Sequence, residues 1–225
     1  MKVITNKEIV LTAVKKNGCA LKFASEELRN DKEIVLIAVE SRGEALKYAP
    51  EKFLNDKDVI LKAVEYYGFA LEYASEELKN DKEVVLKAVG NRGKALQYAS
   101  EELINDEEVV LTAVKNFGFA LEYASERLRD NEDVVLTAVG NRGKALQYAS
   151  ERLRNDKEFI LKAIEINEWA LEFASERLKD DEEFIKEIEK NKKIKKLSNK
   201  GVTPPLRITE KIMFKKIEFL KWKQK

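Results

Sequence analysis

The sequence contains no histidine and only one cysteine, Cys19. Without histidine, the protein lacks the side chain that most often transfers protons at neutral pH and most often binds transition metals. A single cysteine cannot form an internal disulfide or a cluster of thiolate ligands. Most glycines stand alone at intervals of 25 residues, so no glycine-rich phosphate loop is present. The sequence therefore predicts no catalytic, cofactor-binding or metal-binding residues, and it predicts a protein that is not an enzyme.

Long apolar stretches are also missing. Residues 1–8 lack the hydrophobic segment of a secretory signal, and no run approaches the roughly 18 apolar residues of a membrane span. We therefore expect a soluble protein in the cytoplasm, or in a host cell if it is delivered there as an effector. The bias toward Lys, Glu, Asn and Ile is typical of an AT-rich bacterial or phage genome.

Charge is abundant but unevenly distributed. The chain has 42 Lys+Arg and 41 Asp+Glu, which gives a net charge of +1. Residues 186–225 hold 14 basic and 4 acidic side chains, a net charge of +10, which leaves −9 for residues 1–185. An acidic body and a basic C-terminal segment favour partners of opposite charge.

What the sequence contains above all is a 25-residue repeat. One position holds alanine in all seven copies, another holds glycine in six, and no insertion or deletion shifts the register. Such periodicity predicts stacked helical units that bury their apolar faces against each other. The predicted fold class is all-α: an α-solenoid of seven 25-residue helix-turn-helix repeats in residues 1–185, with a C-terminal helical cap in residues 186–225. The glycine position is filled by Gly18, Gly43, Gly68, Gly93, Gly118 and Gly143, with Glu168 in the seventh copy.

The second copy illustrates the predicted unit. Residues 30–33 (Asn-Asp-Lys-Glu) predict a helix start with a capping box, and residues 34–39 follow with apolar side chains at helical spacing. Gly43 is expected to end this helix with a positive φ. A second, shorter helix follows, and Pro50, or serine in the other copies, is expected to begin one further helical turn.

Three positions of the repeat lead to further expectations. The recurring alanine, for example Ala38, marks where neighbouring helices approach most closely. Glu168 in the last glycine position predicts that the seventh unit turns differently from the others. Cys19 occupies a position that is aromatic in other copies, so we expect a partly buried apolar side chain rather than a nucleophile.

The repeat resembles a known family. Residues 80–89 read Asn-Asp-Lys-Glu-Val-Val-Leu-Lys-Ala-Val, and residues 93–103 read Gly-Lys-Ala-Leu-Gln-Tyr-Ala-Ser-Glu-Glu-Leu. This pattern is similar to the bacterial tandem-repeat family called domain of unknown function 4116, and the resemblance extends over about residues 6–185. It implies a helical repeat with no catalytic residues to transfer.

A 50-residue period lies within the 25-residue one, because arginine and aromatic residues alternate around the glycine. In one interpretation these side chains stack along an edge as a cation–π ladder that holds the units together. In the other they form an exposed strip that binds a partner, since arginine and aromatic residues are enriched in binding hot spots. The candidate partner-binding residues are Arg42, Tyr67, Phe69, Arg92, Phe117, Phe119, Arg142 and Trp169.

The basic C-terminal segment also has alternative interpretations. After Glu183 we expect the first helix of an incomplete eighth unit, then a lysine-rich run and, in residues 206–225, an amphipathic helix. The segment would cap the last unit, with its positive charge held against the acidic body. Alternatively it would contact nucleic-acid phosphates or an anionic membrane surface. The candidate nucleic-acid contacts are Lys192, Lys193, Lys195 and Lys196.

The function that this sequence favours is a non-catalytic scaffold for protein–protein interaction. An acidic array suits a basic partner protein, which the chain would bind as an adaptor, an effector or an inhibitor. The alternative is sequence-independent binding of nucleic acid through the basic C-terminal segment.

Overall fold

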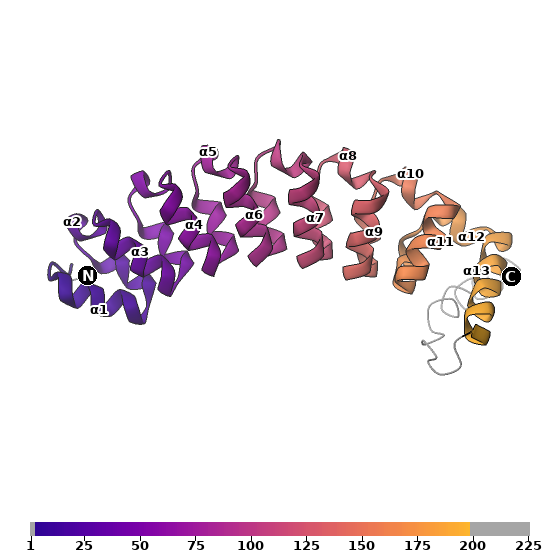
Figure 1. The fold of residues 1–225 in the computed structure, drawn as a ribbon, viewed down its shortest axis with the longest axis horizontal. Coiled ribbons are helices and arrows are strands. Elements are labelled where there is room, and N and C mark those ends of the chain that lie inside the picture. Colours follow the sequence, from indigo (N-terminus) through magenta and orange to yellow (C-terminus); the bar gives the residue numbers. More distant parts are fainter. Residues whose placement is uncertain (1–2, 199–225) are drawn as a thin grey trace, which may run out of the picture.

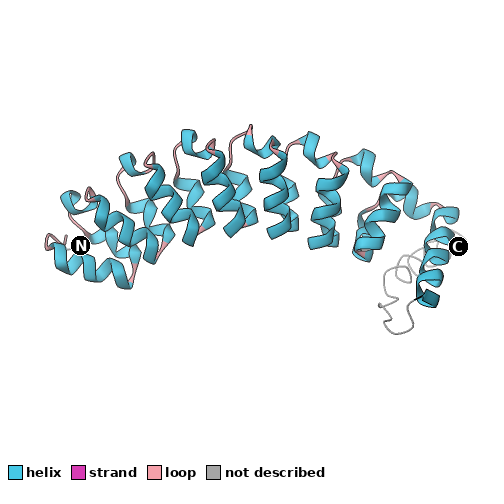
Figure 2. Ribbon diagram, in the orientation of Figure 1, coloured by secondary structure: helices cyan, strands magenta, loops and turns pink. Residues whose placement is uncertain are grey.

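The computed structural model describes the backbone of residues 3–198 and the side chains of residues 3–191. These residues form a row of helical units that curves into an arc, with the N-terminus at one end and α13 at the other (Figures 1 and 2). The described residues contain no strand beyond an isolated bridge between Ile4 and Ala24. The predicted all-α solenoid is confirmed.

Each of the seven units folds as a ten-residue α-helix, a six-residue 3₁₀-helix and a short helical turn. Short turns such as α2, α5, α8 and α10 lie along the convex edge of the arc (Figure 1). The long helices are α1 (Lys7–Lys16), α3 (Lys32–Ser41), α4 (Lys57–Tyr66), α6 (Lys82–Asn91), α7 (Glu107–Asn116), α9 (Glu132–Asn141) and α11 (Lys157–Ile166). The 3₁₀-helices are η1 (Gly18–Phe23), η2 (Gly43–Tyr48), η4 (Gly68–Tyr73), η5 (Gly93–Tyr98), η7 (Gly118–Tyr123), η8 (Gly143–Tyr148) and η9 (Glu168–Phe173). The short turns are α2 (Glu26–Arg29), η3 (Glu51–Phe53), α5 (Glu76–Lys79), η6 (Leu103–Asn105), α8 (Glu126–Arg129), α10 (Glu151–Arg154) and α12 (Glu176–Asp180).

The apolar core runs the whole length of the stack. In α6, for example, Val84, Val85, Ala88 and Val89 are completely buried. Ten residues cannot bury such a face within one helix, so long helices inside the stack, such as α6 between α4 and α7, pack between those of the two neighbouring units. Deleting one of these side chains would leave a cavity between units and cost about 2–5 kcal/mol for a residue of leucine size.

The long helices begin at an aspartate or asparagine, but not in the predicted capping box. In the second unit the N-cap is Asp31 rather than Asn30, and its carboxylate accepts from the N–H of Glu33. Glu33 is thus two residues after the cap instead of the three that a capping box requires. It bonds to the ammonium of Lys7 in the preceding unit at 3.1 Å. The glutamate therefore joins two units instead of closing its own helix.

The repeated glycines serve close packing rather than a positive φ. No described residue has a positive φ, so the predicted role of Gly43 is wrong. A Cβ placed on Gly43 would lie 2.5 Å from the Cβ of Tyr67 and 2.8 Å from the carbonyl oxygen of Ala63, both in the next unit. The five glycines from Gly18 to Gly118 all approach the carbonyl of the next unit's recurring alanine this closely, whereas a Cβ on Gly143 would meet the side chains of Asn167 and Trp169.

The seventh unit turns like the others, contrary to the prediction from Glu168. The residue before η9, Asn167, has φ −152° and ψ 111°, close to the −146° and 108° of Arg142 before η8. What changes is the chain that follows. The next long helix, α13 (Glu182–Ser198), continues for 17 residues through the places where a 3₁₀-helix would begin and end.

The beginning of α13 still follows the repeat. Asp181 accepts from the N–H of Phe184 at 3.0 Å and pairs with Lys157 at 2.6 Å. Phe184 and Ile188 are buried. The proposed domain division after residue 185 falls inside this helix, and it stays a prediction because residues 199–225 are outside the described part of the chain.

Serines and asparagines complete the junctions between units. The hydroxyl of Ser75 accepts from the N–H of Leu78, which is the predicted helix-cap role, while its own N–H donates to the carbonyl of Leu54 in the preceding unit. Asn116 spans the junction from the next unit: its Oδ1 accepts from the N–H of Gly93 at 2.8 Å, and its Nδ2 donates to the carbonyl of Gly90 at 2.9 Å. One amide thereby pairs two backbone groups that the ends of a helix leave unbonded.

Candidate interaction surface

The arginine and aromatic residues predicted as a strip do share one edge of the stack. Arg42, Tyr67, Arg92, Phe117 and Arg142 each stand between a long helix and the following 3₁₀-helix. Each has its Cβ beside the glycine of the preceding unit. The arginines are exposed and the two aromatic residues are half-buried.

Aromatic residues along this edge contact each other across pairs of units. The ring of Phe69 meets Tyr67 at 5.6 Å and Tyr98 of the next unit at 6.4 Å, in edge-to-face geometry. Phe119 repeats the arrangement with Phe117 at 5.6 Å and Tyr148 at 6.1 Å. Such pairs add about 0.5–1.5 kcal/mol to the area they bury. This cluster gives the 50-residue period a physical basis, since it forms where an odd unit meets the following even one.

The predicted arginine–aromatic ladder is wrong for the part of the chain that the structure describes. The cations placed over aromatic rings there are lysines, such as Lys144 over Trp169 at 5.7 Å. Arg42 instead approaches Glu44, with 3.6 Å between Nε and Oε2. The arginines remain available at the surface, so the interpretation as a binding strip stays open.

Trp169 differs from its counterparts in the other odd units. Trp169 occupies the repeat position of Phe69 and Phe119. The residue of α13 that is equivalent to Tyr98 and Tyr148 is not a tyrosine. Trp169 is 46% exposed. Cys19, in the same place of the first unit, is half-buried as predicted.

Tyrosine hydroxyls on this edge lie beside glutamates. Burial raises the pKa of the Tyr98 phenol, and the neighbouring carboxylate of Glu72 raises it further. Burial and then Glu122 act in the same direction on the pKa of Tyr148. These phenols therefore stay protonated at neutral pH.

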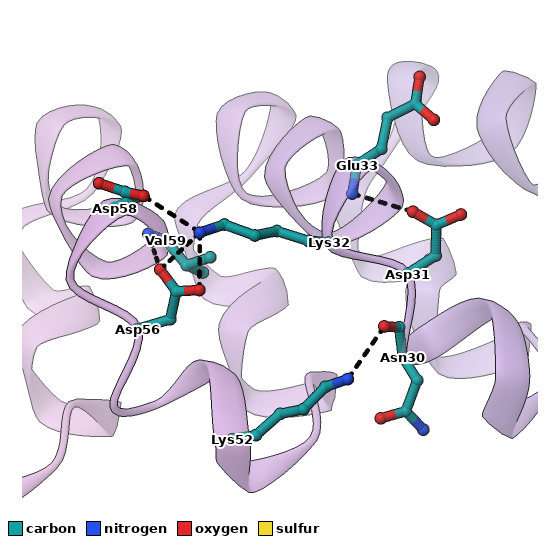
Figure 3. A network of polar contacts seen from close by, with 8 residues as sticks. All are labelled: Asn30, Asp31, Lys32, Glu33, Lys52, Asp56, Asp58 and Val59. Carbon is teal, nitrogen blue, oxygen red and sulfur yellow. Dashed lines mark hydrogen bonds and ion pairs between the residues drawn. The ribbon is translucent and has the colours of Figure 1, made fainter.

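A second surface feature, which the sequence analysis did not predict, is a row of lysines that join the N-termini of successive long helices. Lys32 is representative: its ammonium lies 2.7 Å from Asp56 and 3.1 Å from Asp58 (Figure 3). We call Lys7, Lys32, Lys57, Lys82 and Lys157 the lysine row.

The lysine row changes the titration of both partners. Bonds to Asp81 and Glu83 raise the pKa of Lys57 to about 12. Partial burial raises the pKa of Asp56, but the hydrogen bonds from Lys32 and from the N–H of Val59 outweigh it, so the pKa lies below its usual value. Lysine side chains in the row are more than 40% exposed, which limits what each pair adds to stability.

A third feature is a row of exposed glutamates on the short turns, which we call the glutamate row. Figure 1 shows α5, α8 and α10, which carry Glu76, Glu126 and Glu151, along the convex edge of the arc. Glu76 and Glu176 pair with lysines of their own turns, at 2.8 and 2.6 Å. The row consists of Glu26, Glu51, Glu76, Glu101, Glu126, Glu151 and Glu176.

The candidate nucleic-acid contacts are only partly placed. Lys192, Lys193, Lys195 and Lys196 belong to α13, but their side chains lie outside the described residues, as do residues 206–225. The described residues contain no group of three or more acidic, cysteine or histidine side chains suited to a metal ion. No helix in the described part of the chain is long and apolar enough to cross a membrane.

The lysine row and the asparagines at the junctions between units do leave a signal in the sequence. Lysine recurs at four positions spaced 25 residues apart from Lys7 to Lys82, and asparagine recurs at 91, 116 and 141. A period shows which residues share an edge, but it does not show which unit they contact. That partner depends on the rotation between neighbouring units, which only the structure gives.

The matches to a known protein family follow the same periodicity. The family described as Domain of unknown function (DUF4116) matches residues 6–54, 56–104, 106–154 and 156–194. Successive matches begin 50 residues apart, so one match spans two of the 25-residue units. No curated protein and no solved structure matches the chain.

Proposed function

The chain belongs to the family described as Domain of unknown function (DUF4116), and for this member we propose a non-catalytic role as a scaffold that binds a basic partner protein. The observation that carries the proposal is the glutamate row, a line of exposed carboxylates repeated at every unit along a stacked array. A row held at fixed spacing suits a partner that presents several cations. The role would be that of an adaptor, an effector or an inhibitor.

Electrostatics supports this role. Residues 1–185 carry a net charge of −9. Such a surface accelerates the encounter with a positively charged partner and disfavours nucleic acid, whose phosphates it repels. The close packing at the glycines and the hydrogen bonds of junction asparagines such as Asn116 hold neighbouring units together, so little conformational freedom would be lost when a partner binds along the row.

The proposal is tested by capturing proteins from a cell lysate on the immobilised full-length chain. The wild type is compared with two variants, each of which loses four charged side chains. One variant replaces Glu26, Glu51, Glu101 and Glu126 by glutamine. The other replaces Lys192, Lys193, Lys195 and Lys196 by glutamine. We expect mass spectrometry to identify a basic protein that binds the wild type and the lysine variant, survives nuclease treatment, and is lost from the glutamate variant.

The opposite pattern would favour the alternative function, which is nucleic-acid binding through the basic C-terminal segment. Capture that fails in the lysine variant, or that nuclease abolishes, would mean that the basic segment binds nucleic acid. Capture that is equal in all three proteins would show that the glutamate row does not bind the partner.

A further inference from the structure

The outward face of α1, at the N-terminal end of the stack, is apolar and uncovered. Ile9 lies on this face and is 56% exposed, whereas its equivalents in the next two units, Ile34 and Val59, are completely buried. Ala13, one helical turn further on, is half-buried, although the same alanine of each later unit is fully buried. Each long helix from α3 to α11 packs against the one before it. Among the described residues nothing plays that part for α1, so it presents the face that later units use for stacking.

The segment before α1 replaces only part of a preceding unit. The N–H of Ser25 donates to the carbonyl of Ile4 at 2.9 Å, and the equivalent N–H of Ser75 donates to Leu54 of the unit before it. The segment thus takes the place of a preceding short turn, beside α2. It does not take the place of a preceding long helix, which leaves Ile9 exposed.

The opposite end of the stack is closed by polar residues. α13 contributes Phe184 and Ile188 to the core. Glu189 stands at the position where six units have a completely buried valine, such as Val89. Every exposed side chain of α13 up to residue 191 is charged or an asparagine. A polar outer face of this kind ends a solenoid in water, and α1 has no such face.

Charges beside Ile9 are arranged so that a second α1 fits this face in one direction. At the position of Glu8, the later Glu33 bonds to a lysine of the unit before it. At the position of Lys16, the later Asn116 bonds to a carbonyl of the unit before it. Glu8 lies in the first turn of α1 and Lys16 in the last, about 12 Å apart along the axis. Antiparallel α1 helices would bring Glu8 of each copy to Lys16 of the other, whereas parallel helices would bring like charges together.

We propose that the chain forms a two-fold symmetric dimer in which the outward faces of two α1 helices pack antiparallel. Such an isologous contact, which buries the same surface on both copies, is the commonest kind in soluble homo-oligomers. Ile9 and Ala13 of each copy form its apolar centre, and pairs between Glu8 and Lys16 flank this centre on both sides. The dimer does not depend on the proposed scaffold function, and it holds two arrays in one particle.

The test is analytical ultracentrifugation of the full-length protein at concentrations up to about 1 mM, because contact through one helix face is at the weak end of stable interfaces. We expect the mass to rise from monomer to dimer and no further. Ile9→Lys should raise the dissociation constant at least tenfold, which is what the burial of one isoleucine side chain is worth. The control Ile166→Lys adds the same charge at another exposed isoleucine, in the seventh unit, and should leave the constant unchanged.

Charge reversal tests the antiparallel direction. Glu8→Lys and Lys16→Glu should each raise the dissociation constant about threefold, and the double variant should restore the wild-type value. Urea midpoints of the dilute, monomeric proteins should stay close to that of the wild type, because the substituted side chains are exposed. This measurement separates a loss of association from a loss of folding.

A protein that stays monomeric over the whole concentration range would overturn the dimer. Mass that grows beyond the dimer would overturn the symmetric contact, because it would mean that α1 binds the opposite end of another copy. Loss of association in Ile166→Lys would show non-specific apolar contact instead. A double variant as weak as the two single variants would refute the antiparallel arrangement.

Discussion

Two glycines three residues apart are predicted to respond in opposite ways to the same substitution. Gly93 begins η5, and a Cβ there would lie 2.8 Å from the Cβ of Phe117 and closer still to the carbonyl oxygen of Ala113. Both obstacles belong to the next unit, and one is backbone, so Gly93→Ala must push two units apart. We expect a loss of about 1–3 kcal/mol, the usual cost of overpacking a core.

Gly90→Ala is the matched control. Gly90 lies in the last turn of α6, and a Cβ there meets nothing within 4 Å. Alanine should therefore stabilise the protein by about 0.5–1 kcal/mol, because glycine loses more backbone freedom on folding.

The assay for this pair is urea unfolding followed by circular dichroism. Midpoints are compared directly, since unfolding of a repeat array need not be two-state. We expect the midpoint to fall for Gly93→Ala and to rise for Gly90→Ala. A midpoint for Gly93→Ala at or above that of the wild type would refute the close-packing explanation of the glycines.

Three further predictions follow from the same structure. Asn116→Ala leaves the N–H of Gly93 unpaired at a partly buried junction, so thermal unfolding should show a loss of about 1–3 kcal/mol. Phe119→Ala removes two edge-to-face contacts and should cost about 1–3 kcal/mol, more than Trp169→Ala, whose side chain is 46% exposed; equal costs would contradict the aromatic clusters. The urea midpoint should be nearly flat between about pH 5 and pH 9, since the chain has no histidine. Aspartates of the lysine row have a lowered folded pKa, so their contribution is present above the unfolded pKa of about 3.9 and is lost as the pH falls through the folded value. The raised pKa of Lys57 gives a contribution that is complete below about pH 10.4 and is lost as the pH rises through about 12; a midpoint that changes sharply near pH 6.5 would contradict this account.

The fold could be predicted from the sequence because one physical requirement recurs at every unit. Every copy has apolar residues at the helically spaced positions of Val84, Val85, Ala88 and Val89, so helices and stacking follow from the pattern. The reason why glycine recurs after the long helices could not be predicted from the sequence. A glycine after a helix ordinarily indicates a positive φ, whereas here the next unit excludes a side chain, and that unit's position is not encoded in the local sequence.

The surface was predicted in composition and not in contacts. Arg92 and Phe117 were rightly expected on one edge, yet the ring of Phe117 contacts Phe119, and the cations over rings in the described residues are lysines. Glu33 was assigned to its own helix cap, but it pairs with Lys7 of another unit. Phe117 was expected to contact arginines of neighbouring units and contacts Phe119 of its own unit, whereas the error for Glu33 has the opposite direction. Periodicity alone cannot distinguish a contact within a unit from one between units.

The central claim, that the acidic array binds a basic partner, is tested most directly by titration of the full-length protein with octalysine and with a 20-nucleotide RNA. The comparison uses the glutamate-row variant with Glu26, Glu51, Glu101 and Glu126 changed to glutamine. The account predicts that octalysine binds the wild type, that added salt weakens the binding, and that the variant binds more weakly. Tight binding of RNA together with no binding of octalysine would contradict it.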